Sequence, residues 1–313
     1  MATPKLEPSP AALRNDRIMR TDSSPAEINI GDVLRLALPI NTTLIGGGME
    51  ARRFVNWVVV LASWEDLESQ INPHDLVIIP PSLFARPEPA NFTLTFEMLA
   101  GLPVAGLVCF GTLADELTHQ AEAHNLTILV VPENASVREI HHNISVLLLD
   151  RQSATSERAI QLYRQLSAMS REGQGLAAMT EVMSKLTGNI VAVQDKRLEI
   201  QAISWPSNTT VSREALIEAL QQRDALPPVL RNRKAAAKSR QSIWQQLLPL
   251  GDSPVHLARL LSPIISGDRA RGYLSVIGPV AELDMFDSLT VEHGAAACAL
   301  EMAKTKAVNE AKK

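Results

Sequence analysis

The first third of the chain consists of short runs of apolar residues separated by turn residues. A helix is predicted over residues 28–38, with Asn29 or Asp32 able to cap it. Four bursts rich in β-branched residues predict buried strands, at residues 55–61, 76–79, 104–110 and 127–131. A further helix is predicted over residues 113–125. Because strands alternate with helices, we expect a mostly parallel α/β domain over residues 29–135.

The apolar spacing becomes helical at residue 136 and remains so up to residue 187. Apolar residues recur at helical spacing in two stripes, namely Ile140, Ile144, Leu147 and Leu148, then Ile160, Tyr163, Leu166 and Met169. Gly173 and Gly175 interrupt the pattern, and Gly188 is a plausible C-cap residue. A helical segment with an exposed apolar stripe between two domains usually packs against its twin. Residues 136–187 are therefore predicted to connect the domains and to form a homodimer.

The remaining pattern predicts an antiparallel sheet flanked by helices, over residues 188–303. Strands are predicted at residues 189–193, 198–204, 255–264 and 272–277, the first two joined by a tight polar turn. A helix is expected at residues 213–223, followed by an irregular basic stretch at 226–242. The final helix begins near Met285 and ends in an exit helix at residues 304–313.

The last helix carries a heptad seam that turns polar toward the end of the chain. Its members alternate spacings of four and three residues, namely Val291, Ala295, Cys298, Met302, Thr305 and Asn309. The small residues at 294–297 allow another helix to approach closely. A helix of this kind normally carries a signal onward.

Composition narrows the class of protein. The chain has 313 residues, of which 46% are hydrophobic and 20% charged, and its net charge is -4. This predicts a soluble globular protein of about two domains, with neither a membrane nor DNA as the main partner of the whole chain. Residues 1–28 lack apolar periodicity and are expected to be a disordered arm. The two cysteines, Cys109 and Cys298, lie in apolar surroundings as small buried hydrophobes, which is typical of a cytoplasmic protein.

The sequence contains few residue patterns typical of phosphate-binding, metal-binding or catalytic sites. Gly46–Gly48 lacks the context of a phosphate-binding loop and is best interpreted as a turn. His141 and His142 are adjacent on a helix and point about 100° apart, so they cannot bind one metal ion together. No nucleophile motif occurs. The sequence therefore predicts no catalytic residues, no metal and no cofactor, and the protein is not expected to be an enzyme.

The strongest local charge run is basic. It comprises Arg231, Arg233, Lys234, Lys238 and Arg240. Such a run can contact nucleic acid or an anionic ligand, or it can be a solvated, mobile loop. The interspersed alanines and the polar flank favour the solvated or mobile loop.

The first domain resembles the N-terminal domain of the purine catabolism regulator (PucR) family. The residues that carry this resemblance are, in chain order, 31–34, the glycine turn at 46–48, 55–60, 75–78, 99–107 and 121–132. The chain departs from the family at residues 79–82, where Ile-Pro-Pro-Ser replaces a Leu-Thr-Thr-Gly turn, so the role of that turn is not carried over. The second domain looks like a GAF-type sensor fold, judged by the hairpin at 189–204, the late strand pair and the closing helix.

The resemblance implies the sensory and regulatory portion of a bacterial transcription regulator that dimerises and binds a small metabolite. Relatives bind DNA through a C-terminal helix-turn-helix, and we find none in this chain. The chain is then either part of a longer regulator or a stand-alone sensor. The alternative hypothesis is a protein–protein interaction adaptor that does not bind DNA.

Overall fold

The computed structural model describes residues 27–45, 52–66, 70–84, 101, 103–113, 115–206, 209, 211–248 and 256–311. Residues 1–26 of the predicted arm and the glycine turn at 46–48 lie outside this part of the chain. The predicted arm extends to residue 28, but Ile28 is buried and its carbonyl oxygen accepts a hydrogen bond from the Val55 amide. The ordered fold therefore includes Ile28.

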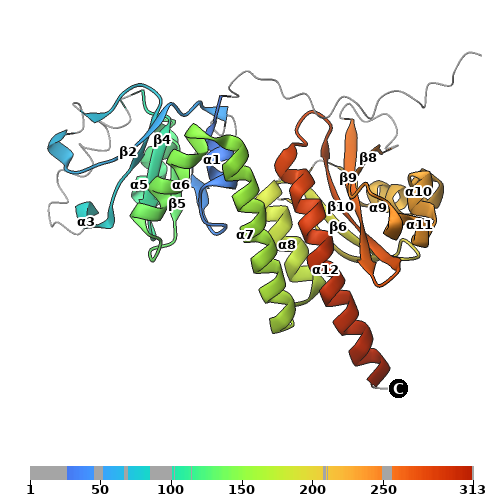
Figure 1. The fold of residues 1–313 in the computed structure, drawn as a ribbon. Coiled ribbons are helices and arrows are strands. Elements are labelled where there is room, and N and C mark those ends of the chain that lie inside the picture. The colour runs from blue at the N-terminus through green and yellow to red at the C-terminus, as the bar shows by residue number, and fades with distance from the viewer. Residues whose placement is uncertain are drawn as a thin grey trace, which may run out of the picture.

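The first sheet contains five strands (Figure 1). They are β1 (Thr43–Ile45), β2 (Trp57–Val60), β3 (Asp75–Ile78), β4 (Gly106–Phe110) and β5 (Ile128–Val131). Their order in the sheet is β1-β5-β4-β3-β2. Strands β2 to β5 pair in parallel, and only β1 is antiparallel to its neighbour. The predicted mostly parallel α/β arrangement is confirmed.

Helices cover both faces of the first sheet, which explains why its strands are apolar throughout. Helices α1 (Ile30–Leu36) and α6 (Val137–Leu149) pack on one face. Helices α3 (Pro81–Phe84) and α5 (Asp115–Ala123) lie on the other, and the 3₁₀ helix η4 (Trp64–Asp66) follows β2. The side chains of α1 and α6 that reach the sheet include Ile30, Val33, Ile140 and Ile144.

The second sheet is antiparallel and has the strand order β7-β6-β10-β9-β8. Its strands are β6 (Ile190–Asp195), β7 (Ile200–Ser204), β8 (Trp244–Leu247), β9 (Leu257–Ser266) and β10 (Arg269–Pro279). Helices α8 (Gly175–Thr187) and α12 (Met285–Ala311) cover one face. The other face carries α9 (Arg213–Gln221), the 3₁₀ helix η5 (Arg223–Ala225), α10 (Pro228–Arg231) and α11 (Arg233–Lys238). The predicted antiparallel sheet flanked by helices is confirmed.

Two features of this second unit were not predicted. The basic stretch expected to be irregular contains α10 and α11, because Asn232 caps α11 by accepting hydrogen bonds from two of its first amides. Strand β8 follows it with the sequence Trp-Gln-Gln-Leu, which neither alternates nor is apolar enough to be identified as a strand from the sequence.

Three helices occupy the centre of the molecule, between the two sheets (Figure 1). They are α7 (Arg151–Glu172), α8 and α12. Gly173 ends α7 in the left-handed conformation at φ 75°, and Gly188 ends α8 at φ 69°, as the sequence predicts. The Tyr163 and His293 rings lie 5.9 Å apart, and Ser170 donates a 2.9 Å hydrogen bond to Glu301. These contacts show that α7 and α12 pack side by side in the same direction.

One apolar core runs from the first sheet through these helices into the second sheet. The heptad positions Val291, Ala295 and Cys298 belong to this core and are buried within the chain itself. In the second helical stripe, Leu166 and Met169 are buried, whereas Ile160 and Tyr163 are exposed by 46% and 36%. The apolar surface that α7 leaves open is therefore centred on Ile160 and Tyr163.

Candidate functional site

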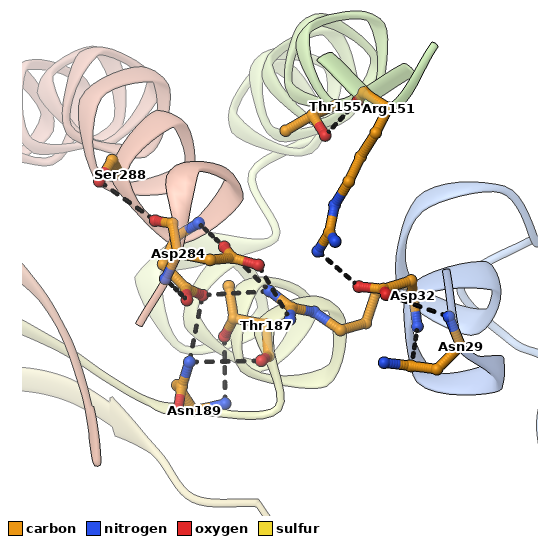
Figure 2. Close-up of polar contacts among 10 residues, drawn as sticks. Asn29, Asp32, Arg151, Thr155, Thr187, Asn189, Asp284 and Ser288 are labelled. Atoms are coloured by element: carbon orange, nitrogen blue, oxygen red, sulfur yellow. Dashed lines mark hydrogen bonds and ion pairs between the residues drawn. The ribbon is translucent and has the colours of Figure 1, made fainter. Parts of the chain in front are cut away.

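The first turn of α12 meets α1 at a polar joint (Figure 2). Helix α1 begins with a capping box, in which Asn29 and Asp32 each accept the other's backbone N–H. The start of α12 repeats this arrangement, because the Asp284 and Asp287 carboxylates each accept the other's amide at 3.0 Å. Asp32 and Asp287 are both buried. Each helix start therefore presents a fixed, buried carboxylate.

Arg35, on α1, connects these two helix starts. Its guanidinium group lies 3.3 Å from Asp284 and 3.5 Å from Asp287. The same group lies over the Phe286 ring at 5.6 Å from the ring centroid, in cation–π geometry. Asn189, which follows α8, donates a 3.1 Å hydrogen bond to Asp287. The joint thus connects α1, the end of α8 and the start of α12.

Burial outweighs the attraction of Arg35 at the centre of the joint. It raises the pKa of Asp287 to about 7, while the positive charge of Arg35 lowers that pKa and the neighbouring Asp284 raises it further. The carboxyl group is therefore shared between its neutral and ionised forms near neutral pH. A group with this property changes charge when its surroundings change slightly.

Helix α7 is fastened to the same joint by two arginines. Arg151 donates a 2.8 Å hydrogen bond to Asp32 and forms an ion pair with it. Arg158 donates to the carbonyl oxygens of Arg35 and Leu38, at 3.1 Å and 2.6 Å, and so satisfies carbonyl groups at the end of α1. Burial lowers the pKa of Arg158 to about 10, so it stays charged at neutral pH.

A second buried charge lies on the face of the second sheet that α9 to α11 cover. Arg259 has no exposed surface, and its Nε donates a 2.8 Å hydrogen bond to Gln246 on β8. Neither terminal nitrogen of Arg259 has a hydrogen-bond partner within the described part of the chain. Burial lowers its pKa to about 10, which leaves it cationic at pH 7. An unpaired buried charge costs several kcal/mol.

Two more buried polar atoms without partners occur on this face. They are the hydroxyl of Ser275 and the side-chain oxygen of Gln194. The sheet register places Ala192 opposite Ser275 and Arg259 opposite Ile277, so Ser275 lies diagonally beside both Gln194 and Arg259. The middle of this buried face is therefore polar.

A larger cavity lies in the first domain, at the amino ends of its parallel strands. Its volume is about 460 Å³, and its lining includes Arg53, His74 and His124. His74 and Asn125, which both line the cavity, have positive φ angles of 65° and 53°. Sequence spacing gave no reason to group these histidines. Nothing in the cavity lining identifies a reacting group.

The structure also gives the positions of the cysteines and of the histidine pair that the sequence analysis considered. Cys109 and Cys298 are buried, so the prediction of buried cysteines is confirmed, and burial raises both thiol pKa values to about 12. His141 and His142 lie in the middle of α6. Across the described residues, no three His, Cys, Asp or Glu side chains are grouped as metal ligands. In that same part of the chain, every helix is too short or too polar to span a membrane.

The titration of Asp287 predicts a specific dependence of stability on pH. Its folded pKa lies above that of an unfolded aspartate, so the folded protein binds more protons between about pH 4 and 7. Stability should therefore fall as pH rises through this range, with a slope of up to about 1.4 kcal/mol per pH unit. Asp287→Asn should remove this contribution, which urea unfolding at several pH values would measure.

Asp284→Asn is the matched control for this experiment. Asparagine also caps helices well, and Asp284 raises the pKa of Asp287 less than burial does, so this variant should keep a fall in stability with rising pH, over a narrower pH range. An Asp287→Asn protein whose stability still changes with pH as the wild type does would contradict the assignment.

The unpaired guanidinium of Arg259 predicts a gain in stability on its removal. Arg259→Met keeps the apolar stem and removes the buried charge, and should raise the free energy of unfolding by about 1–4 kcal/mol. Arg269→Met, at an exposed position on β10, should change it by less than about 0.5 kcal/mol. Strong destabilisation by Arg259→Met would show that the guanidinium has partners in the native protein.

No protein-family model and no curated protein matches this sequence. Among solved structures, the chain is similar to the phycoerythrobilin-bound GAF domain of a cyanobacterial phytochrome, with 18% identity and a TM-score of 0.32, covering 47% of this chain and 97% of that one. It is also similar to a chain of the E. coli DhaR(N)–DhaL complex, with 16% identity and a TM-score of 0.28. That match covers 49% of this chain and 55% of the other, so the chain spans about half of that structure. At TM-scores this low, the bilin and the DhaL partner are features of those proteins alone.

Proposed function

We propose that this protein is a ligand-sensing regulatory protein in which α12 carries the signal. The observation that supports this best is the position of α12. It starts at the joint with the first domain, packs along the second sheet and α7, and continues past the end of that sheet (Figure 1). A change in either domain therefore acts on the same helix.

The second sheet is the sensing element in this proposal. One face packs on α12, and the opposite face carries unsatisfied buried polar groups at Arg259, Ser275 and Gln194. Natural proteins seldom leave buried polar atoms without partners unless they serve a function. A ligand on that face shifts the protein between two states only if it binds one state more tightly. The joint at Arg35 is a suitable switch, because it connects both domains and includes a carboxyl group that titrates near neutral pH.

The finer assignment follows the family resemblance. We propose a cytoplasmic bacterial regulator of the PucR type that acts as a homodimer and binds DNA only through a helix-turn-helix absent from this chain. No catalytic step is assigned to it. The second candidate is a protein–protein adaptor, which the exposed apolar side chains of Ile160 and Tyr163 on α7 favour.

A ligand screen combined with hydrogen exchange tests sensing and coupling together. Nucleotides, purine bases and dicarboxylates would be added to the whole chain while its Tm is measured. At least one compound should raise the Tm by about 2 °C or more and slow amide exchange at residues 285–295. In Arg35→Ala, the same compound should still bind, but its effect on exchange in α1 should be lost. A stabilising compound that leaves exchange in α12 unchanged would contradict the proposal, as would a screen without any response.

A single charged substitution on α7 tests whether the protein dimerises through this helix. Ile160 is 46% exposed in the single chain, so Ile160→Glu leaves the fold intact and places a carboxylate in the proposed interface. The dimer should dissociate at least about tenfold more readily, as measured by light scattering across a concentration series. Leu149→Glu, at a residue 75% exposed near the end of α6, is the control and should leave the dimer intact. A wild-type monomer, or equal effects of both variants, would favour another interface.

A further inference from the structure

A small basic pocket lies at one edge of the second sheet, away from Arg259. Four elements supply its cationic side chains. They are the turn after β6 with Lys196 and Arg197, η5 with Arg223, the end of α10 with Arg231, and the start of α11 with Arg233. The sequence placed Arg231 and Arg233 in a basic run, but Lys196, Arg197 and Arg223 join them only in the fold. The pocket encloses about 30 Å³.

None of these five cations forms an ion pair with a residue that the structure describes, yet three are held in place by backbone carbonyl oxygens. Arg231 donates to the carbonyls of Leu226 and Asp224. Arg223 donates to the Arg231 carbonyl at 3.3 Å, and Arg233 to the Ala270 carbonyl at 2.7 Å. Carbonyl groups fix the guanidinium planes but do not neutralise their charge. The pocket therefore carries a preorganised and uncompensated positive charge.

The floor of the pocket is buried and rigid. Tyr273 on β10 is 3% exposed and donates a 2.6 Å hydrogen bond to the Leu230 carbonyl, which fastens α10 to the sheet. Leu198 has a positive φ of 69°, and its burial in the adjacent apolar cluster compensates for this strained conformation. Burial raises the pKa of the Tyr273 hydroxyl, and the charges of Arg223 and Arg233 lower it, which places both arginines within electrostatic reach of the floor.

We propose that this pocket binds a phosphoryl group of a small-molecule ligand. Like charges that converge in a pocket repel one another. An anion relieves that repulsion and accepts hydrogen bonds from the guanidinium N–H groups that remain free. The inference rests on the proposed sensory function and names the chemical class of its ligand. It also explains why a chain with a net charge of -4 gathers five cations in one place.

Phosphoryl chemistry fits this pocket better than a carboxylate. Arginine forks pair with phosphate in bidentate geometry, and a phosphoryl group offers more oxygens and more charge to five cations than a carboxylate does. The pocket is small, with an enclosed volume of about 30 Å³. Only the end of an anionic group enters it, and the exposed Lys196 and Arg197 contact the oxygens that remain outside.

The test is a calorimetric titration of the whole chain with pyrophosphate at low ionic strength. Arg223→Gln/Arg233→Gln should bind it at least about tenfold more weakly than the wild type. Lys234→Gln/Lys238→Gln removes the same charge from α11 without altering the pocket lining, and should stay within about threefold. Citrate and a short DNA duplex are titrated alongside. Circular dichroism and Tm verify that each variant is folded.

The outcomes distinguish a built phosphoryl pocket from diffuse charge attraction and from a nucleic-acid site. Equal weakening in both double variants would show non-specific charge attraction and overturn the pocket. Tighter binding of DNA than of pyrophosphate, lost with the same arginines, would replace the small ligand with nucleic acid. A loss of pyrophosphate affinity in Arg259→Met, with Arg223→Gln/Arg233→Gln unaffected, would move the anion site to the interior of the sheet and overturn the pocket.

Tyr273 supplies a local readout that a merely structural role of the arginines would not produce. Bound pyrophosphate neutralises the charges of Arg223 and Arg233, so the pKa of Tyr273 should rise in an ultraviolet titration, and Tyr273→Phe identifies its signal. Hydrogen exchange then separates this inference from the proposed function. Binding without any change in α12 would keep the site and overturn the sensory role. Absence of pyrophosphate binding would overturn the site alone.

Discussion

The contact between Arg35 and the first turn of α12 is the constraint on which the two halves of the molecule depend. Asp287 is held there by the Asp284 amide, by Asn189 and by Arg35, and it has no exposed surface. A buried carboxylate cannot lose its partners without a large energetic cost, so the start of α12 and the start of α1 move together. Arg151 and Arg158 add α7 to the same rigid group.

The continuous core strengthens this coupling. Apolar residues of α6, α7, α8 and α12 fill the space between the sheets, and packed interiors transmit small displacements instead of absorbing them. The polar joint is the exception within this region. A shift of one side chain there changes both an ion pair and the protonation equilibrium of Asp287.

The second sheet has opposite properties on its two faces. Toward α12 its side chains are apolar and well packed, with Leu260, Ile264, Leu274 and Val276 in the core. Toward α9 to α11 it carries an unpaired arginine, two polar atoms without partners and, at its edge, the basic pocket. Polar groups that oppose stability are commonly retained where a protein recognises a ligand. In the proposed function, recognition lies on the face toward α9 to α11 and transmission on the face toward α12.

The sequence by itself determined most of the elements, because local patterns are sufficient for those. Short runs of apolar residues between turn residues predicted β2 to β5, and apolar residues at helical spacing predicted α6 to α8. Gly173 and Gly188 marked the ends of two of these helices. Strand β8 and the helices α10 and α11 were missed, because their stability comes from packing and from the Asn232 cap instead of their own apolar pattern. The tertiary structure alone decided the sites. Arg35 and Asp287, or Lys196 and Arg233, are far apart in the chain, and no local pattern reports a contact that only folding creates.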